Sequence, residues 1–206
     1  MRGVLMDNQN HPPENPVRNL IASLFLALPL LAANPKPKVE FATSMGSFTV
    51  QLEPEAAPKT VENFLKYVRK GFYNGTIFHR VIPSFMVQGG GHLPDLTKKP
   101  TEAAIPPEAD LAKSKGMTHK RGTIAMALPV GNPFGATAQF FINVKDNPDL
   151  NFKSKTMTGY GYTAFGKVIK GMEVIDRIKA AKTKTVKDMK DVPATPILIK
   201  EAKEVQ

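Results

Sequence analysis

The chain has 206 residues, of which 42% are hydrophobic and 22% charged; these values suit one globular domain and exclude a wholly disordered chain or a coiled coil. It contains no cysteine, which excludes disulfides, zinc–thiolate sites and thiol nucleophiles. The net charge is +10, but the lysines are scattered among acidic residues and only 8% of residues are aromatic, so we expect a solvated basic surface and no nucleic-acid partner.

The N-terminal segment differs in composition from the rest of the chain. Residues 1–19 are polar and rich in proline, and residues 20–33 form an apolar run of 14 residues that ends in two alanines. That run is shorter than the ~20 residues of a membrane-spanning helix and falls within the ~7–15 residues of a signal-peptide core. We therefore predict an N-terminal tail and signal peptide over residues 1–33, followed by the functional domain over residues 34–206.

A signal peptide implies export to the periplasm or beyond, with no stable membrane insertion after cleavage. Two features weaken this prediction. The polar segment before the apolar run is long, and its basic residues Arg2 and Arg18 are cancelled by Asp7 and Glu14. A disordered tail or a buried core helix, in a cytoplasmic protein, therefore stays open.

From residue 39 onward, short apolar segments alternate with turns rich in glycine and proline, a pattern typical of a small barrel. We expect strands at residues 39–43, 48–52, 76–82, 85–88, 122–128, 139–144, 162–169 and 196–201. We expect helices at residues 60–70 and 172–179. Residues 94–121 form a polar stretch that precedes the fifth of these strands, and the three glycines at 89–91 are expected to form a tight turn.

Residues 78–91, FHRVIPSFMVQGGG, resemble the signature segment of the cyclophilins, the cyclophilin-type peptidyl-prolyl cis-trans isomerases. Four further segments agree in order and type: GFYNGT at 71–76, RGTIAMA at 121–127, AQFFIN at 138–143 and YTAFGKV at 162–168. The resemblance covers residues 39–205 and looks most like bacterial members. It implies a mainly β fold, namely a closed eight-stranded antiparallel β-barrel capped by two α-helices.

The resemblance also implies the reaction, which is rotation about the peptide bond that precedes a proline. The barrier of ~18–20 kcal/mol comes from amide conjugation. Because no atom is transferred, the enzyme needs no nucleophile, metal or cofactor; it must bind the twisted bond more tightly than either planar form. The prolyl nitrogen of the twisted bond regains a basic lone pair, so a fixed donor aimed at that nitrogen would stabilise the transition state.

Arg80 and Gln88 match the catalytic residues of the family. Arg80 aligns with the arginine that donates to the prolyl nitrogen, and Gln88 with a side chain that binds the peptide backbone and helps to orient that arginine. The resemblance assigns the proline pocket to Phe85, Met86, Phe141 and Leu150, with Tyr162 at its rim. The remaining substrate-contacting positions are Ala125, Met126 (through its backbone), Ala127 and Gln139. Phe140 is expected in the core, because neighbouring strand residues face opposite ways.

Several departures from the family pattern concern the substrate groove. Tyr162 stands where many members have a histidine. Asp149 falls where members have an aromatic residue that contacts cyclosporin, so we expect weak binding of that drug. Residues 128–135 are unusual in their proline, glycine and phenylalanine content, and they border the groove for the residues that precede the proline.

The predicted partners are unfolded or extended proline-containing polypeptides, and the protein is expected to be a monomer. Two other function classes stay open. One is a proline-peptide-binding chaperone module of the same fold with incidental catalysis, which would have no need of Arg80. The other is a nucleic-acid-associated protein, suggested only by the net charge. The four histidines have no metal-like spacing, so no metal site is predicted.

Overall fold

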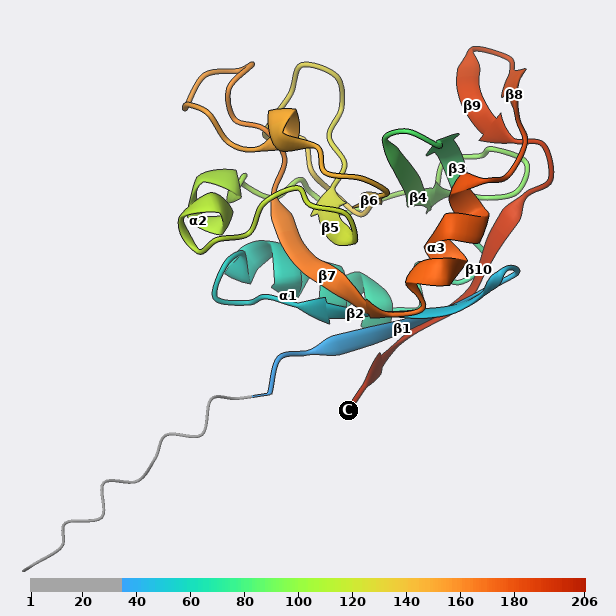
Figure 1. Ribbon diagram of the computed structural model, residues 1–206, viewed down its shortest axis with the longest axis horizontal. Helices are drawn as coiled ribbons and strands as arrows, with labels where there is room; N and C mark the ends of the chain where they lie inside the picture. The colour runs from blue at the N-terminus through green and yellow to red at the C-terminus, as the bar shows by residue number, and fades with distance from the viewer. Residues whose placement is uncertain (1–34) are drawn as a thin grey trace, which may run out of the picture. The chain divides into compact units, whose positions relative to one another are not determined.

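The structure is a computed structural model that describes residues 35–206, so the predicted tail and signal peptide at 1–33 lie outside the described residues. Eight strands close into an antiparallel barrel in the order β1-β10-β3-β4-β6-β5-β7-β2, which confirms the expected barrel (Figure 1). These strands are β1 (Lys38–Thr43), β2 (Gly46–Leu52), β3 (Ile77–Ile82), β4 (Met86–His92), β5 (Thr123–Met126), β6 (Phe140–Asn143), β7 (Ala164–Lys170) and β10 (Ile197–Val205).

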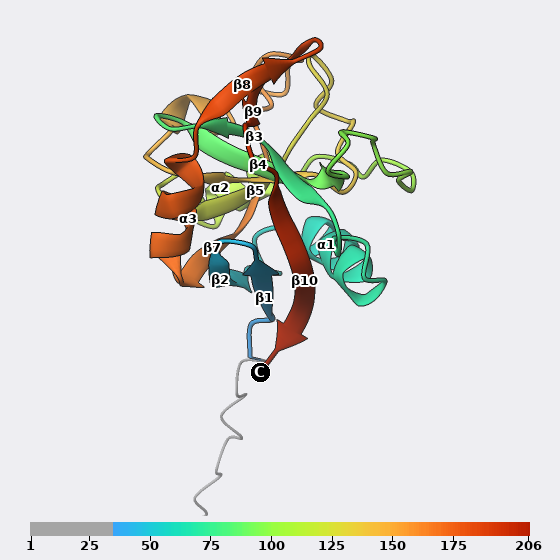
Figure 2. The ribbon, with the colours of Figure 1, turned by 90° about the vertical axis from the view of Figure 1, so that its right-hand side faces the viewer.

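Within residues 35–206, three α-helices and one 3₁₀ turn accompany the barrel. They are α1 (Pro58–Arg69), α2 (Ala109–Ser114), α3 (Met172–Lys179) and the 3₁₀ turn η1 (Pro148–Leu150). Figure 2 shows α1 and α3 on opposite sides of the barrel, and both send apolar side chains into its core. The two expected capping helices are therefore present. The short helix α2 lies in the polar stretch at 94–121 and was not predicted.

The N-terminus of α1 is capped from a distant part of the chain. Pro58 begins the helix, where its missing N–H costs no hydrogen bond. The backbone N–H groups of Lys59 and Thr60 donate to the carboxylate of Glu108 at 3.1 and 2.8 Å, and the Thr60 hydroxyl lies 2.8 Å from the same carboxylate. Glu108 is buried just before α2. Its carboxylate therefore fastens the long excursion between β4 and β5 to the helix that covers the barrel.

Aromatic side chains fill the barrel interior. The rings of Phe41 and Phe48 stack with centroids 4.9 Å apart. Phe140 packs against Phe41 at 5.3 Å and meets Tyr73 edge-on at 5.5 Å. Phe140 is fully buried, which confirms the expectation that it belongs to the core.

The three glycines at 89–91 lie within β4, so the predicted tight turn was wrong. A Cβ atom at Gly90 would lie 2.7 Å from a ring carbon of Phe140, and one at Gly91 would lie 2.4 Å from the side chain of Gln139. Gly90 also has φ +79°, in the left-handed region. The glycines are required because the strand crosses closely packed side chains, and the chain does not reverse there.

A second, two-stranded sheet was not expected from the sequence. Strands β8 (Thr183–Val186) and β9 (Met189–Pro193) form a hairpin outside the barrel. In both ribbon views this hairpin lies beside β3 (Figures 1 and 2). Val192 is buried and anchors the base of the hairpin, whereas the turn at Lys187 and Asp188 is exposed.

Candidate active site

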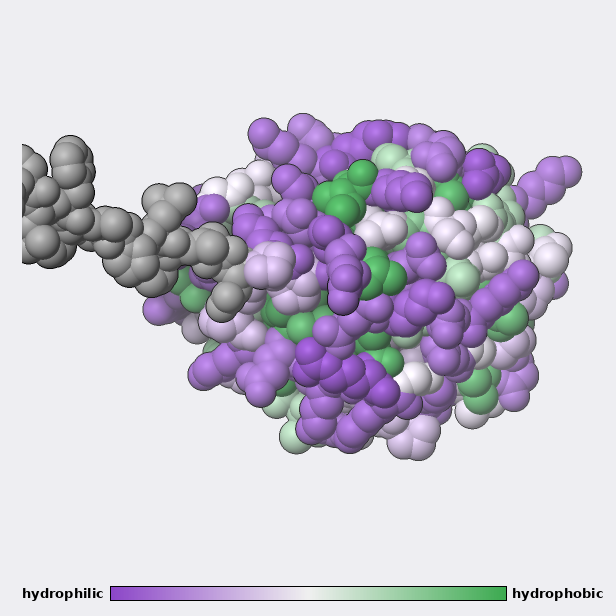
Figure 3. Space-filling model, turned by 90° about the horizontal axis from the view of Figure 1, so that it is seen from below, coloured by the Kyte–Doolittle hydropathy of each residue, from purple (hydrophilic) through white to green (hydrophobic). Residues whose placement is uncertain are grey.

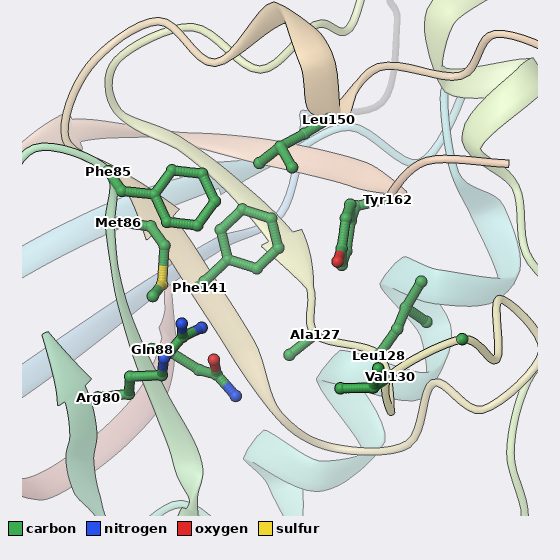
Figure 4. Close-up of a pocket in the computed structure, with 11 residues that line it drawn as sticks. Arg80, Phe85, Met86, Gln88, Ala127, Leu128, Val130, Phe141, Leu150 and Tyr162 are labelled. Atoms are coloured by element: carbon green, nitrogen blue, oxygen red, sulfur yellow. The ribbon is translucent and has the colours of Figure 1, made fainter. Parts of the chain in front are cut away.

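A cavity of about 210 Å³ opens on the outer face of the barrel where β3, β4 and β6 lie side by side. Its residues come from strands far apart in the sequence and from the loops at 127–131 and 148–162. The cavity is lined by Arg80, Phe85, Met86, Gln88, Ala127, Leu128, Val130, Gly131, Phe141, Leu150 and Tyr162 (Figure 4). Eight residues predicted from the sequence therefore meet in one place.

The floor of the cavity is apolar. Met86 and Phe141 are almost fully buried, and with Ala125 and Ala164 they form a cluster separate from the barrel core. The ring of Tyr162 meets Phe141 edge-on, with centroids 5.5 Å apart. In a strand, alternate residues face opposite sides, so Phe141 faces this cavity while its neighbour in β6 faces the core.

Two polar side chains form the opposite wall. Arg80 in β3 pairs with Gln88 in β4 across the sheet, and in Figure 4 both lie on the side of the cavity away from Leu150 and Tyr162. The side-chain amide of Gln88 donates to the Gln139 carbonyl at 3.0 Å. The arginine side chain is 43% exposed and remains open to a ligand in the cavity. Among the cavity-lining residues, Arg80 alone carries a charge at neutral pH.

The remaining predicted substrate residues lie around the cavity. Ala125 lies beneath it, in the apolar cluster of the floor. The side chain of Met126 is buried in the barrel core, so only its backbone could meet a peptide. Gln139 lines a neighbouring hollow of about 320 Å³, which shares Gln88 and Ala127 with the first.

A buried polar network supports the pocket and was not predicted from the sequence. His119 donates from Nε2 to the backbone carbonyl of Tyr162 at 2.9 Å and accepts at Nδ1 from the Asn143 amide at 3.2 Å. The imidazole stacks against Phe141 with centroids 5.8 Å apart. Burial lowers the pKa of His119, so the ring stays neutral and keeps one donor and one acceptor.

The same network fixes the loop that carries Phe85. The side-chain amide of Asn147 donates to the Phe85 carbonyl at 2.9 Å and to the Asn143 side chain at 2.7 Å. The one sequence signal for this network is Asn143, an amide at the end of the apolar segment AQFFIN; it is fully buried, and a buried amide needs several partners. The pocket is thus held by hydrogen bonds from beneath as well as by packing.

The loop at 128–135 forms the rim with exposed apolar side chains. Val130 is fully exposed and borders the cavity, and Phe134 is half exposed with its ring 5.2 Å from that of Tyr160. Asp149 is almost fully exposed and pairs with Lys153 at 3.3 Å. It lines a separate surface hollow beside the rim.

Within residues 35–206, no group of three or more histidine or acidic side chains lies close enough to hold a metal ion. The structure does bring together two histidines, His79 and His92, whose ring centroids lie 4.2 Å apart. In the same part of the chain, no helix is both long and apolar enough to cross a membrane. Figure 3 shows one face of the domain, where polar residues dominate and apolar ones are dispersed.

Comparison with known proteins agrees with this architecture. The family model for cyclophilin-type peptidyl-prolyl cis-trans isomerases matches residues 38–204. The chain is 52% identical over 165 residues to the peptidyl-prolyl cis-trans isomerase cyp18 of Streptomyces antibioticus, covering 80% of this chain and 96% of that protein. It is 46% identical over 161 residues to peptidyl-prolyl cis-trans isomerase B of Escherichia coli, covering 78% and 95%.

A solved structure is similar in both fold and function class. It is a cyclophilin-type isomerase of Cryptosporidium parvum, crystallised in the presence of the dipeptide Ala-Pro. Its TM-score is 0.68 at 28% sequence identity, and the match covers 82% of this chain and 99% of that one. With the signature segment, the barrel and the matched family model in agreement, the chain belongs to the cyclophilin-type peptidyl-prolyl cis-trans isomerases.

Proposed function

We propose that this isomerase rotates Xaa-Pro bonds by holding the proline ring on the apolar floor of the cavity while Arg80 donates to the prolyl nitrogen. The observation that carries the proposal is the meeting of one guanidinium with a cavity whose other lining residues are uncharged and whose floor is apolar. A guanidinium suits the role because it is always protonated and presents its donors in a rigid fork. The nitrogen becomes a good acceptor only when the bond is twisted, so the interaction favours the transition state.

The energies are adequate for this mechanism. Burial of a side chain as large as proline against Met86, Phe141 and Leu150 is worth ~1.5–3 kcal/mol, enough for weak and specific capture. Lowering the rotation barrier by ~5.4 kcal/mol gives about four decades in rate. Fixing the ring leaves the preceding carbonyl free to turn in the open part of the cavity.

The substrate class that fits the site is extended polypeptide containing proline. The hollow lined by Gln139 continues from the cavity past Gln88 and Ala127, so a chain could lie across both. The relative crystallised in the presence of Ala-Pro supports a proline-containing ligand. We assign the enzyme to folding chains, whose Xaa-Pro bonds are exposed and slow to isomerise, and we expect it to act as a monomer.

The test is exchange NMR on an Ala-Pro peptide with the wild type and Arg80→Ala. Removing one transition-state donor should lower kcat/KM by about 10²–10³-fold while peptide affinity is retained. The matched control is Arg69→Ala, because Arg69 pairs with Glu204 on the exposed surface, with Nε and Oε1 2.6 Å apart, and should leave the rate unchanged. Wild-type exchange in Arg80→Ala would disprove the role of Arg80. Peptide binding by the wild type without faster exchange would favour a proline-binding chaperone module.

We also infer that residues 1–33 direct export to the periplasm or beyond. The proposal rests on the apolar run at 20–33, whose length suits a signal-peptide core. Mass spectrometry of the protein from its producing cells should find a chain that begins after residue 33 in the exported fraction. An intact N-terminus in the cytoplasm would contradict the proposal.

A further inference from the structure

The hairpin β8–β9 places a carboxylate beside the arginine of the site. Oδ2 of Asp191, in β9, lies 3.7 Å from Nε of Arg80. This is a close ion pair but longer than a hydrogen bond, so it does not consume the donors of the guanidinium. The two side chains are 39% and 43% exposed, so they meet at the edge of the cavity and not in the core.

The backbone of Asp191 is held in an unusual conformation. Its φ is +61°, in the left-handed region that L residues other than glycine, asparagine and aspartate rarely adopt. The next residue, Val192, is buried, so the base of the hairpin is fixed to the barrel. Of the two aspartates in this hairpin, Asp191 thus stands next to the fixed base and is directed at Arg80.

We propose that Asp191 is a positioning residue that orients Arg80 for catalysis, an inference that rests on the proposed role of Arg80. Arginine has a long side chain with many rotamers, and this one is only half covered by the sheet. Attraction at Nε restrains rotation of the guanidinium and leaves its two terminal amino groups for the prolyl nitrogen. A donor misplaced by about 1 Å can cost up to about 100-fold in rate, so a weak restraint at this point has a large effect.

The restraint should act on the transition state and not on capture of the ring. Asp191 is not among the residues that line the cavity, whereas the floor residues that hold proline are. Loss of the carboxylate should therefore lower kcat and leave KM unchanged. We expect Asp191→Asn to lower kcat about 3- to 10-fold. Asparagine is the matched change, because it keeps the size of the side chain and tolerates the same φ.

The experiment is a double-mutant cycle by exchange NMR, with Asp191→Asn, Arg80→Ala and the double variant. If Asp191 acts through Arg80, Asp191→Asn should have no further effect once Arg80 is alanine. Asp191→Gly also accepts a positive φ and removes the carboxylate, so its kcat should be lowered as much as that of Asp191→Asn. This second variant guards against one that fails to fold. Asp188→Asn, in the exposed turn of the same hairpin, is the control and should match the wild type.

A second readout reports the restraint directly. The amplitude of motion of the Arg80 Nε–H bond, measured by ¹⁵N relaxation, should be larger in Asp191→Asn than in the wild type or Asp188→Asn. Wild-type kcat in Asp191→Asn, or an equal loss in the presence and absence of Arg80, would overturn the inference while the proposed function stands. Full activity of Arg80→Ala would overturn both.

Discussion

Phe140 and Phe141 are neighbours in β6, yet they belong to two different apolar clusters. Phe140 is surrounded by aromatic rings on every side and is closed to solvent. Phe141 packs on His119 and Tyr162 and forms the floor of an open cavity. The first cluster holds the barrel together, whereas the second leaves room for a ligand. The same residue type therefore serves stability or binding according to the face of the strand it occupies.

Alanine at the two positions should have the largest effects, and the effects should differ in kind. Phe140→Ala should lower the free energy of unfolding by ~3–5 kcal/mol, because it opens a cavity in a closed core. Phe141→Ala should cost less, since the space that its ring leaves opens into the cavity and can be filled by water. It should instead weaken binding of an Ala-Pro peptide by about 10-fold or more. Urea unfolding and NMR titration measure the two effects, and equal losses of stability would refute the distinction.

Acid should destabilise the folded barrel, because a buried histidine, His79, lies in its wall next to Arg80. Burial, with a smaller contribution from neighbouring His92, lowers the pKa of His79 to about 3. The unfolded chain takes up this proton near pH ~6.5, whereas the folded one stays neutral down to about 3. Stability should therefore fall as the pH drops below ~6.5 and level off near 3, with a loss of ~2.7 kcal/mol at pH ~4.5 from this group alone.

The measurement is urea unfolding of the wild type and His79→Leu across this pH range. The variant removes the proton-binding group while keeping an apolar side chain in the buried space, so its stability should fall less steeply on acidification. Identical slopes for the two proteins would show that other groups govern the acid response.

The smallest expected effect belongs to the exposed rim. Val130 buries nothing in the free protein, so Val130→Ser should change the free energy of unfolding by no more than ~0.5 kcal/mol. It should weaken binding of a peptide with a leucine before proline by about 2-fold, because a small apolar contact is lost. A peptide with glycine before proline is the control and should bind both proteins equally. Equal affinities for the leucine peptide would remove this loop from substrate recognition.

The strands could be predicted because short apolar segments alternate with turns rich in glycine and proline, and the resemblance implied that they close into a barrel. The hairpin β8–β9 could not, because its strands are mostly polar and only Val192 and Pro193, at its base, are buried. The short helix α2 has six residues, too few for an apolar stripe to register. The glycines at 89–91 were misread because their local conformational freedom favours a turn, while the cause of their presence is close packing against Phe140 and Gln139.

The residues of the candidate site were predicted through family resemblance, whereas the side chains that support them were not. Resemblance assigned Arg80 and the pocket residues, and the structure places most of them around one cavity. The hydrogen bonds of His119 and the approach of Asp191 join residues that are distant in sequence. Nothing in local composition indicates such partners, because the contact depends on how the loops and the hairpin fold back on the barrel.

The pairing of β1 with β10 has a consequence for how this protein is made. Lys38 opposes Val205, so the barrel joins nearly the first described residue to nearly the last. The ribosome adds ~5–20 residues per second from the N-terminus, and until β10 has emerged both β1 and β3 lack a neighbour along one edge. The barrel can close only after its last nine-residue strand is released. A nascent chain of this isomerase thus remains open throughout translation, and truncation before Ile197 would leave two strand edges free for aggregation.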